Sequence, residues 1–153
     1  MATEIERILD QMDRAFAGDA WHGPSLMALL EGVSAEDAAR RPIAQAHSIW
    51  ELVNHIRAWN EIVERRLRNE IVKVTPEMDW PAVPLASDVT WKRALDALKK
   101  SRAQLRRTVE QLEDAQLNEN PPGLPDSRYV LLHGLVQHDL YHAGQIAVLK
   151  KAL

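Results

Sequence analysis

The chain has 153 residues, of which 46% are hydrophobic and 27% are charged, a length and composition that predict one globular domain spanning residues 1–153. The net charge of −3 excludes the broad positive field typical of nucleic-acid-binding proteins. The sequence has no cysteine, which excludes disulfides, cysteine-rich zinc sites and a protein-borne thiol nucleophile, and which agrees with a cytoplasmic location. No stretch approaches the roughly 20 apolar residues needed to cross a membrane.

The first predicted helix covers residues 2–16, where apolar side chains recur at steps of three and four. A connecting region follows. Its Gly-Pro pair at residues 23–24 and the capping signal from Ser34 to Asp37 predict two short helices. We expect Trp21, just before this region, to pack over the end of the fold, and we consider His22 for the rim of a pocket.

The second predicted helix covers residues 48–69 and begins with a capping box, in which Ser48 and Glu51 each satisfy a backbone N–H group. Apolar residues then form one face of the helix. The Pro-rich segment at residues 74–87 excludes a long helix, and we expect it to cover one end of the fold.

The third predicted helix covers residues 88–116, with an apolar seam that is interrupted at Arg102, and the fourth covers residues 127–151. No segment has the alternation of a strand. Together these elements predict an all-α fold, a four-helix bundle with short extra helices between its first two long helices. The gap at Arg102 is compatible with the edge of an interface between subunits.

Two basic runs, at residues 64–68 and 99–107, lie on predicted helices and have acidic residues nearby. Such runs are typical of solvated helix faces. We therefore predict no nucleic-acid partner, and the absence of an apolar span predicts no membrane partner.

Three of the six histidines lie on or beside apolar helix faces. At 100° per residue, His138 and His142 lie within about 20° of Leu131, whereas His133 lies on the opposite face of the same helix. His55 flanks the apolar face of the second helix, so His55, His138 and His142 from two helices are predicted to converge inside the bundle. Buried imidazoles need polar partners, and one divalent metal ion would satisfy all three.

Other interpretations of these polar residues stay open. Each of the three histidines can instead be a hydrogen-bonded core residue. His47 is predicted to make a surface or capping contact, and Asp139 either orients an imidazole of the metal site or forms an interhelical charge pair. Asn54 and Gln145 are further candidates for polar groups near the site. We expect Trp50, Trp59 and Trp91 to be core residues.

The segments WHGPSL, HSIWELVNHIRAW and HDLYHAGQI, in this order along the chain, resemble the DinB-like (DinB/YfiT) family. The resemblance implies a four-helix bundle that forms a homodimer and holds a divalent metal ion with three side chains, here His55, His138 and His142. Zinc and nickel are the ions that we expect first. Relatives that use low-molecular-weight thiols imply thiol S-transferase chemistry on a small-molecule substrate, with the thiol as cosubstrate. Metal-dependent hydrolysis and a non-enzymatic metal-binding stress-response module are the alternatives.

Overall fold

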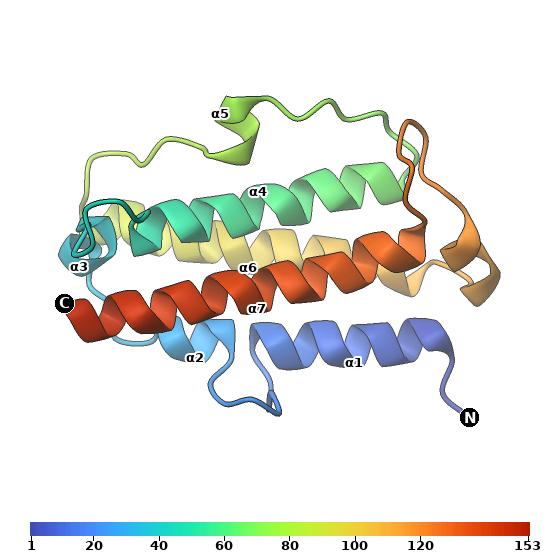
Figure 1. The fold of residues 1–153 in the computed structure, drawn as a ribbon, viewed down its shortest axis with the longest axis horizontal. Helices are drawn as coiled ribbons and strands as arrows, with labels where there is room; N and C mark the ends of the chain where they lie inside the picture. Colours follow the sequence, from blue (N-terminus) through green and yellow to red (C-terminus); the bar gives the residue numbers. More distant parts are fainter.

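Four long helices form the body of the protein in a computed structural model that describes all residues 1–153. Figure 1 shows them side by side with roughly aligned axes. The chain contains no strand, and its extended pairing is limited to an isolated bridge between Ala20 and Gly23. The predicted all-α four-helix bundle is confirmed. The long helices are α1 (Glu4–Phe16), α4 (Ile49–Leu67), α6 (Asp88–Glu110) and α7 (Arg128–Ala152).

Three short α-helices and one 3-10 helix fill the connections. Two of them, α2 (Leu26–Leu30) and α3 (Ala35–Ala39), lie between α1 and α4, as the sequence predicted. The third, α5 (Pro76–Asp79), lies in the long connection between α4 and α6. In Figure 1 this connection runs along the outer side of α4. The expectation that it covers one end of the bundle is therefore wrong.

Local capping explains where the long helices begin. The backbone N–H of Ser48 donates to Glu51 Oε2 over 2.7 Å, and the backbone N–H of Glu51 donates to Ser48 Oγ over 3.1 Å, which is the predicted capping box. Ser87 and Ser127 cap α6 and α7 with their side chains in the same position. Each hydroxyl satisfies a backbone donor that has no partner inside its helix.

The third long helix ends earlier than predicted. It stops at Glu110, and residues 114–118 instead form the 3-10 helix η1 (Asp114–Asn118). The turn brings the Asp114 carboxylate to the start of α1, where it accepts hydrogen bonds from the backbone N–H groups of Glu4 and Ile5 over 2.9 and 3.0 Å. A carboxylate is favourable at a helix N-terminus because it faces the positive end of the helix dipole.

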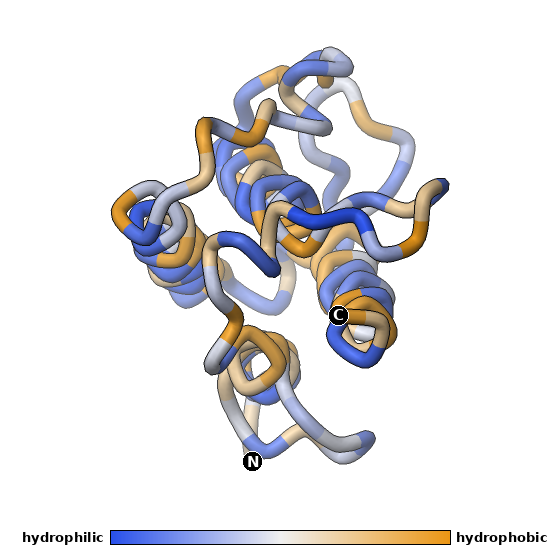
Figure 2. The backbone as a smooth tube through the Cα atoms, turned by 90° about the vertical axis from the view of Figure 1, so that its left-hand side faces the viewer, coloured by the Kyte–Doolittle hydropathy of each residue, from blue (hydrophilic) through white to orange (hydrophobic).

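The core consists of two apolar clusters, of 15 and 11 buried residues, one toward each end of the bundle. In Figure 2, each long helix carries hydrophobic and hydrophilic segments in alternation, as expected for helices that bury one face. Between the clusters, α4, α6 and α7 bury polar residues instead. We call these residues the polar layer: Asn60, Ser101, Arg102 and Asp139.

The polar layer corrects two details of the predicted helix faces. Arg102 is only 3% exposed and forms an ion pair with Asp139, which is 0% exposed, so the gap in the α6 seam is an internal ion pair and no interface edge. The buried face of α7 is centred on Asp139, whereas Leu131 and His138 are half-buried.

Trp21 is fully exposed and does not pack over the bundle end.

None of the helices combines the length and the apolar character that a membrane span requires.

Candidate metal centre

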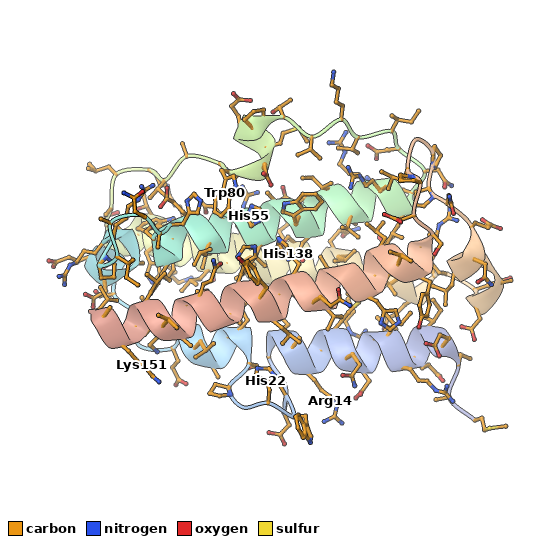
Figure 3. The ribbon with its side chains drawn as sticks, viewed as in Figure 1. Arg14, His22, His55, Trp80, His138 and Lys151 are labelled. Carbon is orange, nitrogen blue, oxygen red and sulfur yellow. The ribbon has the colours of Figure 1, made fainter.

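Three imidazole rings meet in the space between α4 and α7. The Nε2 atoms of His138 and His55 are 2.9 Å apart, and those of His142 and His138 are 3.1 Å apart. His55 and His142 are buried, and His138 is half-buried. Figure 3 shows His55 and His138 approaching each other from the two helices. The convergence predicted from the sequence is therefore present, and we call these three residues the histidine triad.

The outer ring nitrogens of two triad residues have partners that fix their protons. His55 Nδ1 donates to the backbone carbonyl of Asp79 over 2.6 Å, and His142 Nδ1 donates to Gln145 Oε1 over 2.6 Å. Both partners are acceptors, because a carbonyl oxygen has no proton to give. In these two neutral rings the proton therefore stays on Nδ1, and the Nε2 lone pair faces the centre of the triad.

This arrangement lacks a central partner within the chain. Since His55 and His142 carry their protons on Nδ1, only His138 can have a proton on Nε2. This single proton cannot satisfy the Nε2 lone pairs of both other rings. A divalent cation would match all three, since neutral imidazole nitrogen is a common ligand of zinc and of other transition metals. The observed nitrogen separations are close to the roughly 3.3 Å that tetrahedral zinc–imidazole geometry implies. The donor set fits a metal ion.

The electrostatics of the triad also favour ligand function. Burial, together with the charges of the neighbouring His142, His55 and Arg102, lowers the pKa of His138 to about 3. Burial likewise lowers the pKa of His55 and of His142. All three rings are thus neutral near pH 7, which is the protonation state in which imidazole binds a metal ion.

The connection that contains α5 shields the triad. The Trp80 ring stacks between His47 and His55, with centroid distances of 3.6 and 3.9 Å. Trp59 Nε1 donates to Asp79 Oδ1 over 2.8 Å, and Asn54 Nδ2 donates to the carbonyl of Ala82 over 3.3 Å. These two hydrogen bonds tie the connection to α4, so that Trp80 covers one side of the triad (Figure 3).

Sequence reasoning missed Asp79 and Trp80. Both lie in a Pro-rich segment that has no long-range pattern, and only the Thr75 cap followed by Pro76 signals the short helix that positions them. Trp59 was expected in the core but is half-buried and belongs to this cover. Trp50 and Trp91 are core residues, as predicted.

The remaining candidates fall into two groups. Gln145 orients His142, and His47 is exposed beside Glu51, with its ring against Trp80. In contrast, the carboxylate of Asp139 pairs with Arg102 and orients no imidazole.

Two further histidines lie away from the triad. His22 is exposed near α2, on the opposite side of α7 from the triad in Figure 3. His133 lies against the Tyr129 ring and near the Glu4 carboxylate, and not in the triad, as the helical periodicity predicted.

The comparison with protein families agrees with this architecture. The family model of the DinB superfamily matches residues 20–146, a range that includes all three residues of the triad. No curated protein and no solved structure matches the chain. Because the match covers most of the chain, the protein belongs to the DinB superfamily.

Proposed function

We propose that this member of the DinB superfamily binds one divalent transition-metal ion through the Nε2 atoms of His55, His138 and His142. The observation that carries the proposal is the set of three inward-facing nitrogens, two of which have their outer nitrogens held by Asp79 and Gln145. An outer hydrogen bond of this kind fixes the tautomer and the orientation of a metal-binding imidazole. Zinc and nickel are the ions that we propose, since imidazole suits both.

The proposed activity is an S-transferase reaction between a low-molecular-weight thiol and a small electrophilic substrate. Three protein ligands leave a coordination position open, where a bound metal ion would supply Lewis-acid activation of a thiol or of water. The chain supplies no thiol of its own, so the sulfur nucleophile would come from a cosubstrate. Trp80 and Trp59 would shield the reacting groups from bulk water, and Gln145 would hold His142 in place.

Metal analysis of the untagged protein tests the first step. We expect about one zinc or nickel ion per chain in the wild type, and a strong loss in His138→Ala, because two imidazoles hold a zinc-type ion poorly. His133→Ala is the matched control, since this histidine is on the same helix but outside the triad. Equal metal content in wild type and His138→Ala would contradict the proposal.

An activity assay tests the second step. The metal-loaded protein is incubated with a generic aryl halide electrophile and, in separate reactions, with mycothiol, bacillithiol or no thiol. Thiol consumption that requires both the metal and His138 supports S-transferase chemistry. Substrate cleavage without any thiol would instead indicate metal-dependent hydrolysis. Metal binding without either reaction would indicate a non-enzymatic metal-binding module.

We further propose that the protein forms a homodimer, on the basis of the family resemblance. The first turn of α7 exposes two large apolar side chains, Tyr129 and Val130, which are 43% and 48% exposed. Burial of such side chains against a second copy would be favourable. Sedimentation analysis at micromolar concentration tests the proposal, with Val130→Glu as the variant expected to dissociate. A monomeric wild type would contradict it.

A further inference from the structure

A cavity of about 330 Å³ lies beside the histidine triad, between the segment that precedes α4 and the outer side of α7. Apolar side chains form most of its wall, among them Ile43, Leu52, Tyr141 and Val148. Gln145 also lines the cavity, and it is the residue that accepts the hydrogen bond from His142. The cavity is thus one side chain away from the proposed metal ligands.

The lining favours an uncharged ligand. It contains no Asp, Glu, Lys or Arg, so it offers no counter-charge to a charged group. Its polar side chains include His47, whose ring stacks on Trp80, and Gln145. The volume is at the lower end of the roughly 300–1,000 Å³ that is usual for small-molecule sites. A neutral, mainly apolar molecule with about one ring fits this chemistry.

The Gln145 amide supplies the specific contact. Its Oε1 atom accepts the proton of His142 Nδ1 in the tautomer that turns the Nε2 lone pair of His142 toward the triad. The Nε2 group of Gln145, which carries two donor protons, makes no hydrogen bond within the chain. It is therefore available to a ligand in the cavity that it lines.

We propose that this cavity is the substrate pocket, and that it takes a neutral apolar molecule whose carbonyl oxygen, or similar neutral acceptor, accepts a hydrogen bond from Gln145. This inference rests on the proposed function in one respect: the bound molecule is a substrate only if the adjacent triad holds a reactive metal ion. Binding itself needs no metal ion, so the two proposals can fail separately.

Three ligands of similar shape test the chemistry: acetophenone, which carries a neutral carbonyl; cumene, which lacks an acceptor; and benzoate, which is charged. Each is titrated into the metal-free protein and followed by the NMR signals of backbone amides and of the Gln145 side chain. We expect acetophenone to bind about three- to tenfold more tightly than cumene and at least about tenfold more tightly than benzoate. Equal or tighter binding of benzoate would overturn the proposal.

Substitutions on α7 test the location. A Cβ atom at Gly144, which lines the cavity, would meet no atom within 4 Å, so Gly144→Leu is expected to fold and to abolish acetophenone binding. Gly134→Leu is the matched control, because Gly134 has equally open surroundings on the same helix and does not line the cavity. Gly144 also borders a groove on the side facing α2, so Ala147→Leu, which narrows that groove alone, is expected to leave binding unchanged.

Gln145→Glu tests the hydrogen-bond donor in the metal-free protein. The carboxylate can still accept the proton of His142 Nδ1, but it offers no donor to the cavity at pH 7.5. The donor group is lost, so acetophenone should bind about threefold to tenfold more weakly. Unchanged acetophenone binding in Gln145→Glu would overturn the proposal. A second result would also overturn the proposal: Gly144→Leu changes the sedimentation of the protein but not its binding of acetophenone. The cavity would then be an interface between two copies of the chain.

Discussion

Two neighbouring residues of α7 show two ways in which a bundle accommodates buried polar groups. Asp139 faces α6 and pairs with Arg102, so opposite charges compensate each other within the chain. His138 faces α4 and meets His55 and His142, all three neutral and with nitrogens that face one another. The two charges of the ion pair balance each other within the chain, whereas the facing nitrogens of the triad lack a central partner. The comparison supports the proposal that the triad binds a metal ion, because only the triad leaves facing nitrogens without a counterpart.

Removal of one partner of the ion pair should have the largest effect. Arg102→Met leaves the Asp139 carboxylate fully buried and without its counter-charge, and we expect the free energy of unfolding to fall by about 3–5 kcal/mol. Urea denaturation of the metal-free protein measures this change. The double variant Arg102→Met/Asp139→Leu should recover most of the loss, because an apolar pair of similar volume needs no compensation. A loss below about 1 kcal/mol in the single variant would show that the pair is solvated.

The triad should respond to an added ligand in the way that the ion pair does not. Zinc at about 100 times its dissociation constant should stabilise the wild type by about 2.7 kcal/mol, measured by denaturation with and without the ion. His138→Ala should gain almost nothing at the same concentration, while His133→Ala should behave like the wild type. If His138→Ala is stabilised as much as the wild type, the histidines are hydrogen-bonded core residues.

Loss of the outer hydrogen bond of His142 should reduce zinc affinity less than loss of His138 itself. Gln145→Ala removes the acceptor of His142 Nδ1, and we expect zinc affinity to fall by about 10- to 100-fold, as is usual when a metal ligand loses its orienting partner. Isothermal titration at pH 7.5 measures the affinity. Gln145→Glu keeps an acceptor at the same place and is the control that should retain it. Equal affinity in all three proteins would show that packing alone orients His142.

The sequence predicted the fold and the members of the triad, because helical periodicity and N-terminal caps are local signals. Ser48 and Glu51 fix the start of α4, and the spacing of His138 and His142 places them one turn apart. The partners of these rings were beyond such reasoning. Asp79 contacts His55 through a backbone carbonyl, which any residue type supplies, and Trp80 reaches the triad through a fold-dependent connection. Arg102 interrupts an apolar seam, and its partner Asp139 is known only once the structure shows which face of α7 packs against α6.

Acid should destabilise the folded protein through the histidine triad. Burial lowers the pKa of His138 to about 3, and it also lowers the pKa of His55 and His142, so below about pH 6.5 the unfolded chain binds more protons than the folded chain. The stability that the neutral triad contributes is therefore complete above about pH 6.5 and is lost as the pH falls toward the folded-state pKa values. In His138→Leu, the slope of unfolding free energy against pH between 6 and 4 should decrease by at most about 1.4 kcal/mol per pH unit. Urea denaturation in the presence of a chelator measures the slope, and Gln137→Leu, which removes no ionisable group from the same helix, is the control. An identical slope in His138→Leu and in the wild type would show that His138 titrates alike in both states, and that the triad is open to water.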